Sequence, residues 1–183
     1  MVFRASERPM RAFKVLLAGD GGVGKTTLLD AFKLGRFFEH NATIGLNITL
    51  CAVRLEDGRK CKLIVFDFSG QPRFMRMAYD IPRLVRRAYG AILVFDLSCL
   101  MTLPTLLEWS SIIREANGDI PIILVGTKAD LEHEVGEEDI RDFMGRLGAR
   151  AYIETSSKLM KNVDLPFKML AKMIMDEYTS LSS

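Results

Sequence analysis

The sequence predicts an α/β fold built on a mostly parallel, doubly wound sheet. Several near-continuous apolar runs are typical of strands that helices cover on both faces of a sheet. Helix-like stretches follow these runs, and this alternation favours parallel pairing of the strands. A glycine-rich segment also joins the first strand to the first helix, where such sheets bind ligands beyond the carboxyl ends of their strands. We expect strands over residues 13–18, 46–55, 61–67, 91–96, 120–126 and 151–154, and helices over residues 25–34, 72–88, 103–116, 137–147 and 162–178.

Turn residues refine two of these elements. Residues 46–55 and 61–67 flank an Asp-Gly dipeptide that begins at Asp57, and this dipeptide is typical of a tight hairpin turn. We therefore expect these two strands to form a β-hairpin. Pro82 lies inside the arginine-rich stretch 72–88 and is expected to end or bend the helix there, because proline lacks a backbone N–H.

Composition indicates a single globular domain. The 183 residues are 49% apolar and 26% charged, and the net charge of +2 is too small to argue for nucleic-acid binding. No apolar run is long enough for a transmembrane helix, and the amino end lacks the apolar core of a signal peptide. We expect a flexible basic tail over residues 1–11, one domain over residues 12–178 and a short tail over residues 179–183.

The three cysteines favour a cytoplasmic location, because an odd number without a secretion signal suggests reduced thiols. No cysteine follows Cys99, so the carboxyl end carries no prenylation motif and no stable lipid anchor is evident. Either the protein is soluble or a tail has been removed. Any membrane association is expected to be transient and to occur through partners.

The strongest single motif runs from Gly19 to Thr26 and matches the phosphate-binding pattern G-x-x-x-x-G-K-[ST] between a strand and a helix. Glycines let successive backbone N–H groups face one point, and the helix adds the positive end of its dipole. Lys25 is expected to reach the β- and γ-phosphates of a nucleotide, and the Thr26 hydroxyl to bind Mg²⁺.

A second motif follows the strand 61–67. An aspartate at the end of an apolar strand, here Asp67, holds Mg²⁺ directly or through water in proteins that also have a phosphate loop. The chain continues to Gly70, whose backbone N–H could donate to a γ-phosphate, and to Gln71, which could orient an attacking water.

Two polar segments follow the strands 120–126 and 151–154. Asp130 has two acceptor oxygens that match the two donors of a guanine base, and the methylenes of Lys128 can cover a base face. Backbone N–H groups of residues 154–158 could meet the guanine oxygen. Taken alone, each segment is better explained as an ordinary polar loop.

In combination, the motifs resemble those of the Ras-superfamily small GTPases, and most closely those of Rab-like members. They are G-x-x-x-x-G-K-T at residues 19–26, T-I-G at 43–45, D-x-x-G-Q at 67–71, T-K-x-D at 127–130 and S-S-K at 156–158. The resemblance covers about residues 12–178. It implies a P-loop NTPase fold with a six-stranded sheet, one antiparallel strand and about five helices on both faces. It also implies a GTP-binding switch in signalling or trafficking that hydrolyses GTP to GDP and phosphate.

The resemblance assigns roles to individual residues. The phosphates would be surrounded by Gly21, Gly22, Val23, Gly24, Lys25, Thr26 and Thr27. Guanine would be bound by Thr127, Lys128, Asp130, Ser156, Ser157 and Lys158, and Phe37 would pack against the nucleoside. Mg²⁺ would be held by Thr26, by Asp67 through water and, in the GTP state, by Thr43. Catalysis would depend on Gln71, Lys25, Gly70 and Thr43.

The resemblance further implies a monomer whose partners are GTP-state effectors, an exchange factor and a GTPase-activating protein. Two residues depart from the family pattern. Thr127 replaces the commonest Asn and cannot bridge the base and the phosphate loop as an amide does, although we expect guanine specificity to persist. Pro72 replaces the usual Glu after Gln71, and it either changes hydrolysis by restricting the backbone of Gln71 or simply begins a helix.

The segment 73–87 holds five arginines and a single acid, Asp80. It is either a solvated helix face or a basic docking surface for an acidic partner. A third interpretation is that one of these arginines stabilises the phosphates of the nucleotide bound to its own chain during hydrolysis.

Three functions fit these observations. The leading prediction is a slow GTPase switch that a partner accelerates. The alternative is a guanine-nucleotide-binding scaffold with negligible intrinsic hydrolysis, which Pro72 favours and Gln71 opposes. A kinase that uses ATP is opposed by the two segments that match guanine.

Overall fold

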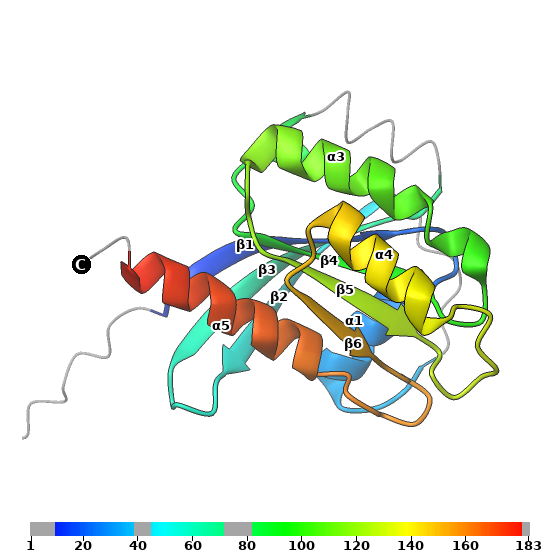
Figure 1. Ribbon diagram of the computed structural model, residues 1–183. Helices are drawn as coiled ribbons and strands as arrows, with labels where there is room; N and C mark the ends of the chain where they lie inside the picture. Colours follow the sequence, from blue (N-terminus) through cyan, green and yellow to red (C-terminus); the bar gives the residue numbers. More distant parts are fainter. Residues whose placement is uncertain (1–9, 39–44, 72–81, 181–183) are drawn as a thin grey trace, which may run out of the picture.

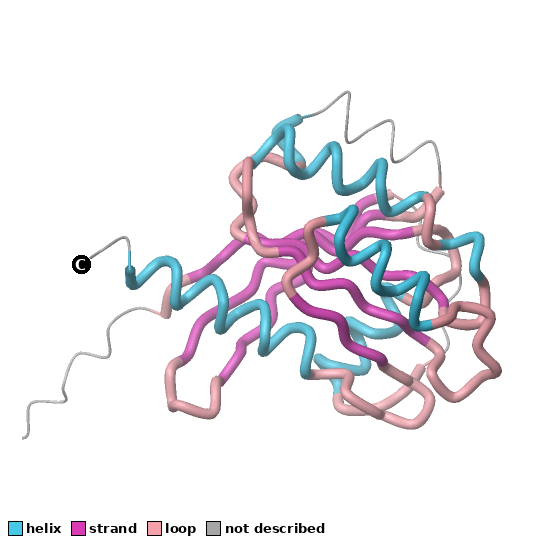
Figure 2. The backbone as a smooth tube through the Cα atoms, viewed as in Figure 1, coloured by secondary structure: helices cyan, strands magenta, loops and turns pink. Residues whose placement is uncertain are grey.

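The computed structural model describes residues 10–38, 45–71 and 82–180 (Figure 1). Its centre is a six-stranded sheet, drawn in magenta in Figure 2, with the strand order β2-β3-β1-β4-β5-β6. Strand β2 runs antiparallel to β3, and the other neighbours are parallel. This arrangement confirms the predicted sheet. In chain order the strands are β1 (Ala12–Gly19), β2 (Leu46–Arg54), β3 (Lys60–Phe68), β4 (Gly90–Asp96), β5 (Ile122–Thr127) and β6 (Ala151–Glu154).

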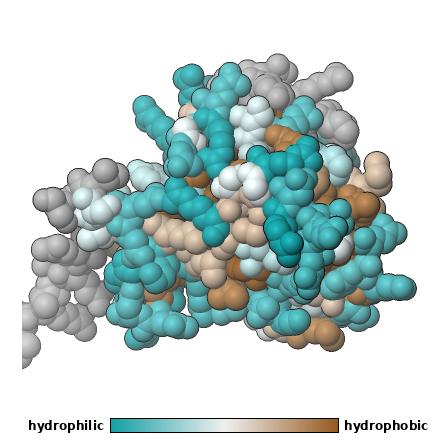
Figure 3. Space-filling view, viewed as in Figure 1, coloured by the Kyte–Doolittle hydropathy of each residue, from teal (hydrophilic) through white to brown (hydrophobic). Residues whose placement is uncertain are grey.

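Four α-helices cover the sheet in the described part of the chain. They are α1 (Lys25–Leu34), α3 (Thr105–Asn117), α4 (Glu137–Leu147) and α5 (Leu165–Ser180). Apolar side chains of α1 and α5 pack on one face of the sheet, and those of α3 and α4 pack on the other. On the face seen in Figure 3, hydrophilic side chains predominate, with smaller apolar areas between them, because each helix buries mainly the side that faces the sheet.

Burial explains why the strands differ in pattern. Every residue of β4 and of β5 is buried, since both strands lie inside the sheet with helices on both faces. The edge strand β2 instead alternates buried and exposed residues, with Cys51 and Val53 inside and Ile48 and Leu50 more than half exposed. The β2–β3 pair is the predicted hairpin, and Gly58 in its turn has a φ of 85° that favours glycine.

Two helix predictions need correction. About five helices were expected, but residues 72–81 of the expected helix 72–88 lie outside the described residues, and Pro82–Leu84 form a short 3₁₀ helix, η1. Pro82 lacks the N–H that an α-helix would need at that point. The last helix begins at Leu165 rather than near residue 162, because Asn162 has a left-handed backbone with φ 55° and its side chain donates to the Glu154 carbonyl at 3.0 Å.

Strand register brings the polar motifs to one edge of the sheet. Gly19 at the end of β1 pairs with Val94 of β4, and Asp96 at the end of β4 pairs with Thr127 at the end of β5. The parallel strands therefore all deliver their motifs to the same edge, as the sequence predicted. None of the helices in the described ranges is long and apolar enough to cross a membrane. All three cysteines are free thiols, as expected.

Candidate functional site

The loop between β1 and α1 adopts a conformation that depends on glycine. Gly22 and Gly24 have φ values of 73° and 94°, and no atom lies within 4 Å of a Cβ built at either position. The left-handed backbone, rather than crowding, therefore favours glycine at these two positions. At Gly19, a side chain is excluded by a steric clash, since a Cβ would lie 2.0 Å from the Val94 carbonyl oxygen. The result is a curled loop with open space over Gly22 and Gly24.

Lys25 begins α1 and is only 5% exposed. Its ammonium donates to the carbonyl oxygens of Gly19 at 2.9 Å and Asp20 at 2.6 Å, so the side chain folds back along the loop. Burial lowers the pKa of Lys25 to about 8, although the negative charges of Asp67 and Asp20 oppose this shift. A buried ammonium of this kind gains most from an incoming anion, which would raise its pKa again.

Thr26 and Asp67 place two oxygen ligands side by side. The Thr26 hydroxyl donates to Asp67 Oδ2 at 2.6 Å, and Asp67 is fully buried near the end of β3. Mg²⁺ prefers hard oxygen ligands and is usually held by one or two protein groups together with waters and phosphates. The pair fits such a site, whereas Thr43, the other predicted ligand, lies outside the described residues.

Gly70 lies directly against the phosphate loop. A Cβ at Gly70 would be 2.1 Å from the carbonyl carbon of Asp20 and 2.2 Å from the nitrogen of Gly21, so only glycine fits there. Gln71 follows with a half-buried side chain, and its backbone N–H lies at the long distance of 3.5 Å from Ser69 Oγ. Gly70, one of the two residues predicted to act on the γ-phosphate, therefore lies next to the loop, and Gln71 is its neighbour in the chain. Pro72, the next residue, is outside the described ranges.

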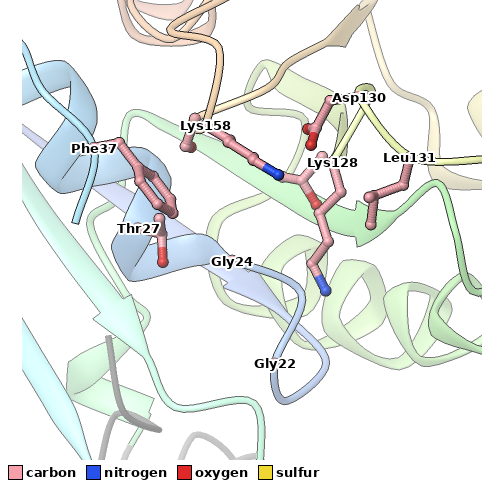
Figure 4. A pocket seen from close by; sticks show the side chains of 10 residues that line it. Gly22, Gly24, Thr27, Phe37, Lys128, Asp130, Leu131 and Lys158 are labelled. Atoms are coloured by element: carbon pink, nitrogen blue, oxygen red, sulfur yellow. The ribbon is translucent and has the colours of Figure 1, made fainter. Parts of the chain in front are cut away.

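A pocket of about 390 Å³ opens beside the same loop (Figure 4). In Figure 4, Phe37 lies on one side of this pocket and Leu131 on the opposite side, with Lys158 and Lys128 between them. The lining residues are Gly22, Gly24, Thr27, Phe37, Thr127, Lys128, Asp130, Leu131, Ser157 and Lys158. All of these except Leu131 were predicted from the sequence. Leu131 is 47% exposed, and its position directly after Asp130 is the signal that could have found it.

Thr127 connects β5 to the phosphate loop. Its hydroxyl oxygen lies 2.6 Å from the Val23 carbonyl oxygen and 2.9 Å from that of Phe95, and the residue is buried. One hydroxyl proton serves one acceptor at a time, so the two contacts alternate or one dominates. Thr127 thus keeps the contact with the loop that an amide would make, although it is shorter than asparagine.

Asp130 and Ser156 hold each other in place. The Ser156 hydroxyl donates to Asp130 Oδ1 at 2.5 Å, and Ser156 is fully buried. Ser156 is itself fixed by two backbone hydrogen bonds with Lys161, at 3.1 and 2.8 Å. The hydrogen bond orients the Asp130 carboxylate toward one geometry, which reduces the entropy that Asp130 would lose on binding a ligand.

Lys128 has an unpredicted partner. Its ammonium lies 2.5 Å from Asp96 Oδ2, and Asp96 is 5% exposed at the end of β4. Lys128 also has a left-handed backbone with φ 58°, which turns the chain so that its methylenes line the pocket. The ion pair holds the charged end of Lys128, while the methylenes of its side chain remain exposed to the pocket. Asp96 could have been noticed in the sequence because it ends the apolar strand 91–96, but nothing in the sequence indicated that it would pair with Lys128.

Comparison with known proteins identifies the family. Residues 14–176 match the model of the Ras family. The chain is 34% identical over 171 residues to the Ras-related protein Rab-19 of Bos taurus, covering 91% of this chain and 77% of that protein. It is 35% identical over 177 residues to the Ras-related protein Rab-26 of Bos taurus, covering 94% and 67%.

A similar relation holds outside animals. The Ras-related protein YPTC6 of Chlamydomonas reinhardtii is 35% identical over 162 residues, covering 86% of this chain and 73% of that protein. The match to the family model runs from within β1 to within α5 and includes the phosphate loop. The chain therefore belongs to the Ras family, and it is a Rab-like GTP-binding switch and GTPase that uses Mg²⁺ and acts in signalling or trafficking.

Proposed function

We propose that the residues predicted from the sequence bind GTP and hydrolyse it, with separate groups of residues for the base, for the phosphates and for the reaction. The observation that carries this proposal is the 390 Å³ pocket, in which the phosphate loop meets both guanine-type segments. Asp130 would accept from the two donors of guanine, while the methylenes of Lys128 and the ring of Phe37 would cover flat faces of the nucleoside. Ser156, Ser157 and Lys158 would complete the base site, and Ser156 would act by fixing Asp130.

The phosphates would lie over the glycines of the loop, from Gly21 to Thr27. Backbone N–H groups at the amino end of α1 attract anions, and the Lys25 ammonium would exchange its loop carbonyl partners for phosphate oxygens. Thr26 and Asp67 would hold Mg²⁺, and Thr43 would join them in the GTP state. When bound, Mg²⁺ would neutralise the charge that develops on the phosphates during hydrolysis.

Hydrolysis would depend on Gln71 and Gly70. Gln71 would orient the attacking water, and the Gly70 N–H would donate to the γ-phosphate from its position against the loop. Positioning of this kind does most of the work in phosphoryl transfer, since little covalent chemistry is left to the protein. We expect slow turnover by the isolated chain, and we expect a GTPase-activating protein to accelerate it.

Two measurements test the proposal. Affinities for GTP and ATP, compared on the same nucleotide-depleted protein, test the base site, and a strong preference for GTP is expected. Phosphate release from bound GTP then tests hydrolysis in a single turnover. Binding without any phosphate release would favour the scaffold alternative, which family membership does not favour. Equal affinity for ATP would contradict the roles given to Asp130 and Lys128.

We propose that the protein works as a monomer in the cytoplasm and reaches membranes through its partners. Those partners would be GTP-state effectors, an exchange factor and a GTPase-activating protein. The proposed reason for state-dependent binding is that the γ-phosphate holds Thr43 and Gly70, and hydrolysis releases the segments around them. Affinity capture with GTP-loaded and GDP-loaded protein tests this idea, because effectors should be retained only by the GTP-loaded form.

A further inference from the structure

The stretch from η1 to β4, residues 82–89, is anchored to the domain by its apolar residues. Val85 is 1% exposed and Ala88 is 7% exposed, and both belong to the core that packs under α3. This stretch precedes β4, so it lies at the end of the sheet opposite to the phosphate loop, near the carboxyl end of α3 (Figure 1). The surface it forms is therefore separate from the nucleotide pocket.

Lys14 of β1 fixes one side of this stretch. Its ammonium donates to the carbonyl oxygens of Arg83 at 3.3 Å and Arg86 at 2.8 Å. The backbone N–H of Tyr89 donates in turn to the Lys14 carbonyl at 2.9 Å. Because the carbonyls of Arg83 and Arg86 converge on one ammonium, the backbone at both positions is held in a single arrangement.

Asn117, at the end of α3, fixes the other side. Its amide nitrogen donates to the Val85 carbonyl at 3.1 Å, and its amide oxygen accepts from the Ala88 N–H at 3.0 Å. Both polar ends of one side chain are thus used on the same turn. A turn held by Lys14 on one strand and Asn117 on one helix presents its outer side chains on a preorganised backbone.

The outer side chains are three arginines, Arg83, Arg86 and Arg87, and all three are exposed. Within the described ranges, none of them makes a salt bridge or donates a side-chain hydrogen bond. Some other arginines in the described ranges are paired, such as Arg114 with Asp119 and Arg150 with Glu177, whereas Arg54 and Arg141 are exposed without a salt bridge. The turn therefore carries three uncompensated guanidinium groups within five residues of sequence.

Arg87 adds an independent observation. Its φ of 59° lies in the left-handed region, which glycine and asparagine occupy readily and which is costly for other residues. Glycine would relieve this strain without loss of a side-chain hydrogen bond or salt bridge, because the exposed Arg87 side chain makes neither within the described ranges. A strained residue whose side chain makes no polar contact within the described part of the domain points to a role in function.

We propose that Arg83, Arg86 and Arg87 form a docking surface for an acidic segment of a partner protein. Guanidinium groups bind carboxylates in a bidentate geometry, which suits closely spaced glutamates or aspartates. Tyr89 follows this turn in the sequence and is 44% exposed, with its ring packed edge-on against Phe13. A membrane surface is disfavoured, because attraction to anionic lipids takes about four to eight clustered basic residues and this chain has a net charge of only +2.

Fluorescence anisotropy with the full chain loaded with GDP tests this surface. The probe is a fluorescein-labelled peptide in which glutamates alternate with serines, and a lysine–serine peptide serves as the charge control. The double variant Arg86→Glu/Arg87→Glu should bind the acidic peptide at least about tenfold more weakly than wild type at low salt. Arg141→Glu makes the same kind of charge reversal at an exposed position on α4 and should leave binding close to wild type.

Arg87→Gly separates binding from folding. Its thermal midpoint should equal or exceed that of wild type, because strain is relieved, while its affinity for the acidic peptide falls. A lowered midpoint would give Arg87 a structural role and would overturn the proposal. The proposal also fails if wild type does not bind the acidic peptide, or if Arg141→Glu loses as much affinity as the double variant. Binding to phosphatidylserine vesicles in place of the peptide would overturn it in favour of a membrane surface.

Discussion

The hydroxyl oxygen of Thr127 lies 2.6 Å from the carbonyl oxygen of Val23, so the end of β5 is bonded to the phosphate loop. This contact would couple the proposed base site to the proposed phosphate site through one buried side chain. The sequence suggested that replacing asparagine by threonine would weaken the connection between the two sites. The short distance indicates instead that threonine keeps the contact with the loop.

Thr127→Val removes the hydroxyl and keeps the shape of the side chain. The Val23 and Phe95 carbonyls then lose a donor, and an unsatisfied buried polar group costs about 1–3 kcal/mol. We expect the free energy of unfolding to fall by that amount and GDP to dissociate faster. Chemical denaturation and the release of a fluorescent GDP analogue measure both effects. Thr127→Ser retains the hydroxyl and is the control, and equal losses in the two variants would contradict this role.

Asp130→Ala is expected to abolish the preference for GTP over ATP. Hydrogen bonds to a charged group are worth about 1.5–3 kcal/mol each, so losing two of them should lower GTP affinity by a hundredfold or more. Equilibrium binding of both nucleotides measures the change. Asp142→Ala removes an exposed carboxylate on α4 that pairs with Arg146, and it should leave both affinities unchanged. Retained GTP preference in Asp130→Ala would be incompatible with base recognition by this residue.

Nucleotide affinity should decrease with rising pH because of Lys25. Burial lowers the pKa of Lys25 to about 8, and bound phosphates need the protonated form. Between pH 8 and 9, GDP affinity should fall by up to about tenfold as binding takes up one proton. Lys25→Met should bind more weakly and show a flatter pH profile. Identical profiles for the two proteins would assign the pH dependence to another group.

The same pKa shift affects the stability of the nucleotide-free protein. The folded-state pKa of about 8 lies below the ordinary 10.5, so the unfolded chain binds more protons than the folded chain between these values. The free energy of unfolding should therefore rise as pH increases through this window. Denaturation at several pH values measures the slope, and Lys25→Met should reduce it. A slope that persists in Lys25→Met would have a different origin.

Gln71→Ala should slow single-turnover hydrolysis by at least about tenfold, because positioning of the nucleophile would be lost. GTP affinity should not change, since Gln71 does not line the nucleotide pocket. Rapid-quench measurement of phosphate release reports the rate. Pro72→Glu tests the residue that follows, and a rate equal to wild type would mean that Pro72 does not restrict Gln71. An unchanged rate in Gln71→Ala would mean that a different group orients the attacking water.

The sequence was most informative where the site residues are neighbours along the chain. The loop from Gly19 to Thr26 and the hairpin turn at Gly58 were both predictable, because a left-handed glycine is a local requirement. Helix ends were less predictable. Just before α5, Asn162 donates a hydrogen bond to the Glu154 carbonyl, and no local pattern encodes that contact.

The sequence by itself determined which chemistry gathers at the sheet edge: the phosphate loop, the aspartate near the end of β3 and the two guanine-type segments. Only the tertiary structure decided how these groups are held. The hydrogen bonds from Thr127 to Val23, from Lys128 to Asp96 and from Ser156 to Asp130 span 104, 32 and 26 residues. Such pairs form because parallel crossovers bring distant strand ends together, and a linear pattern carries no information about which side chains then meet.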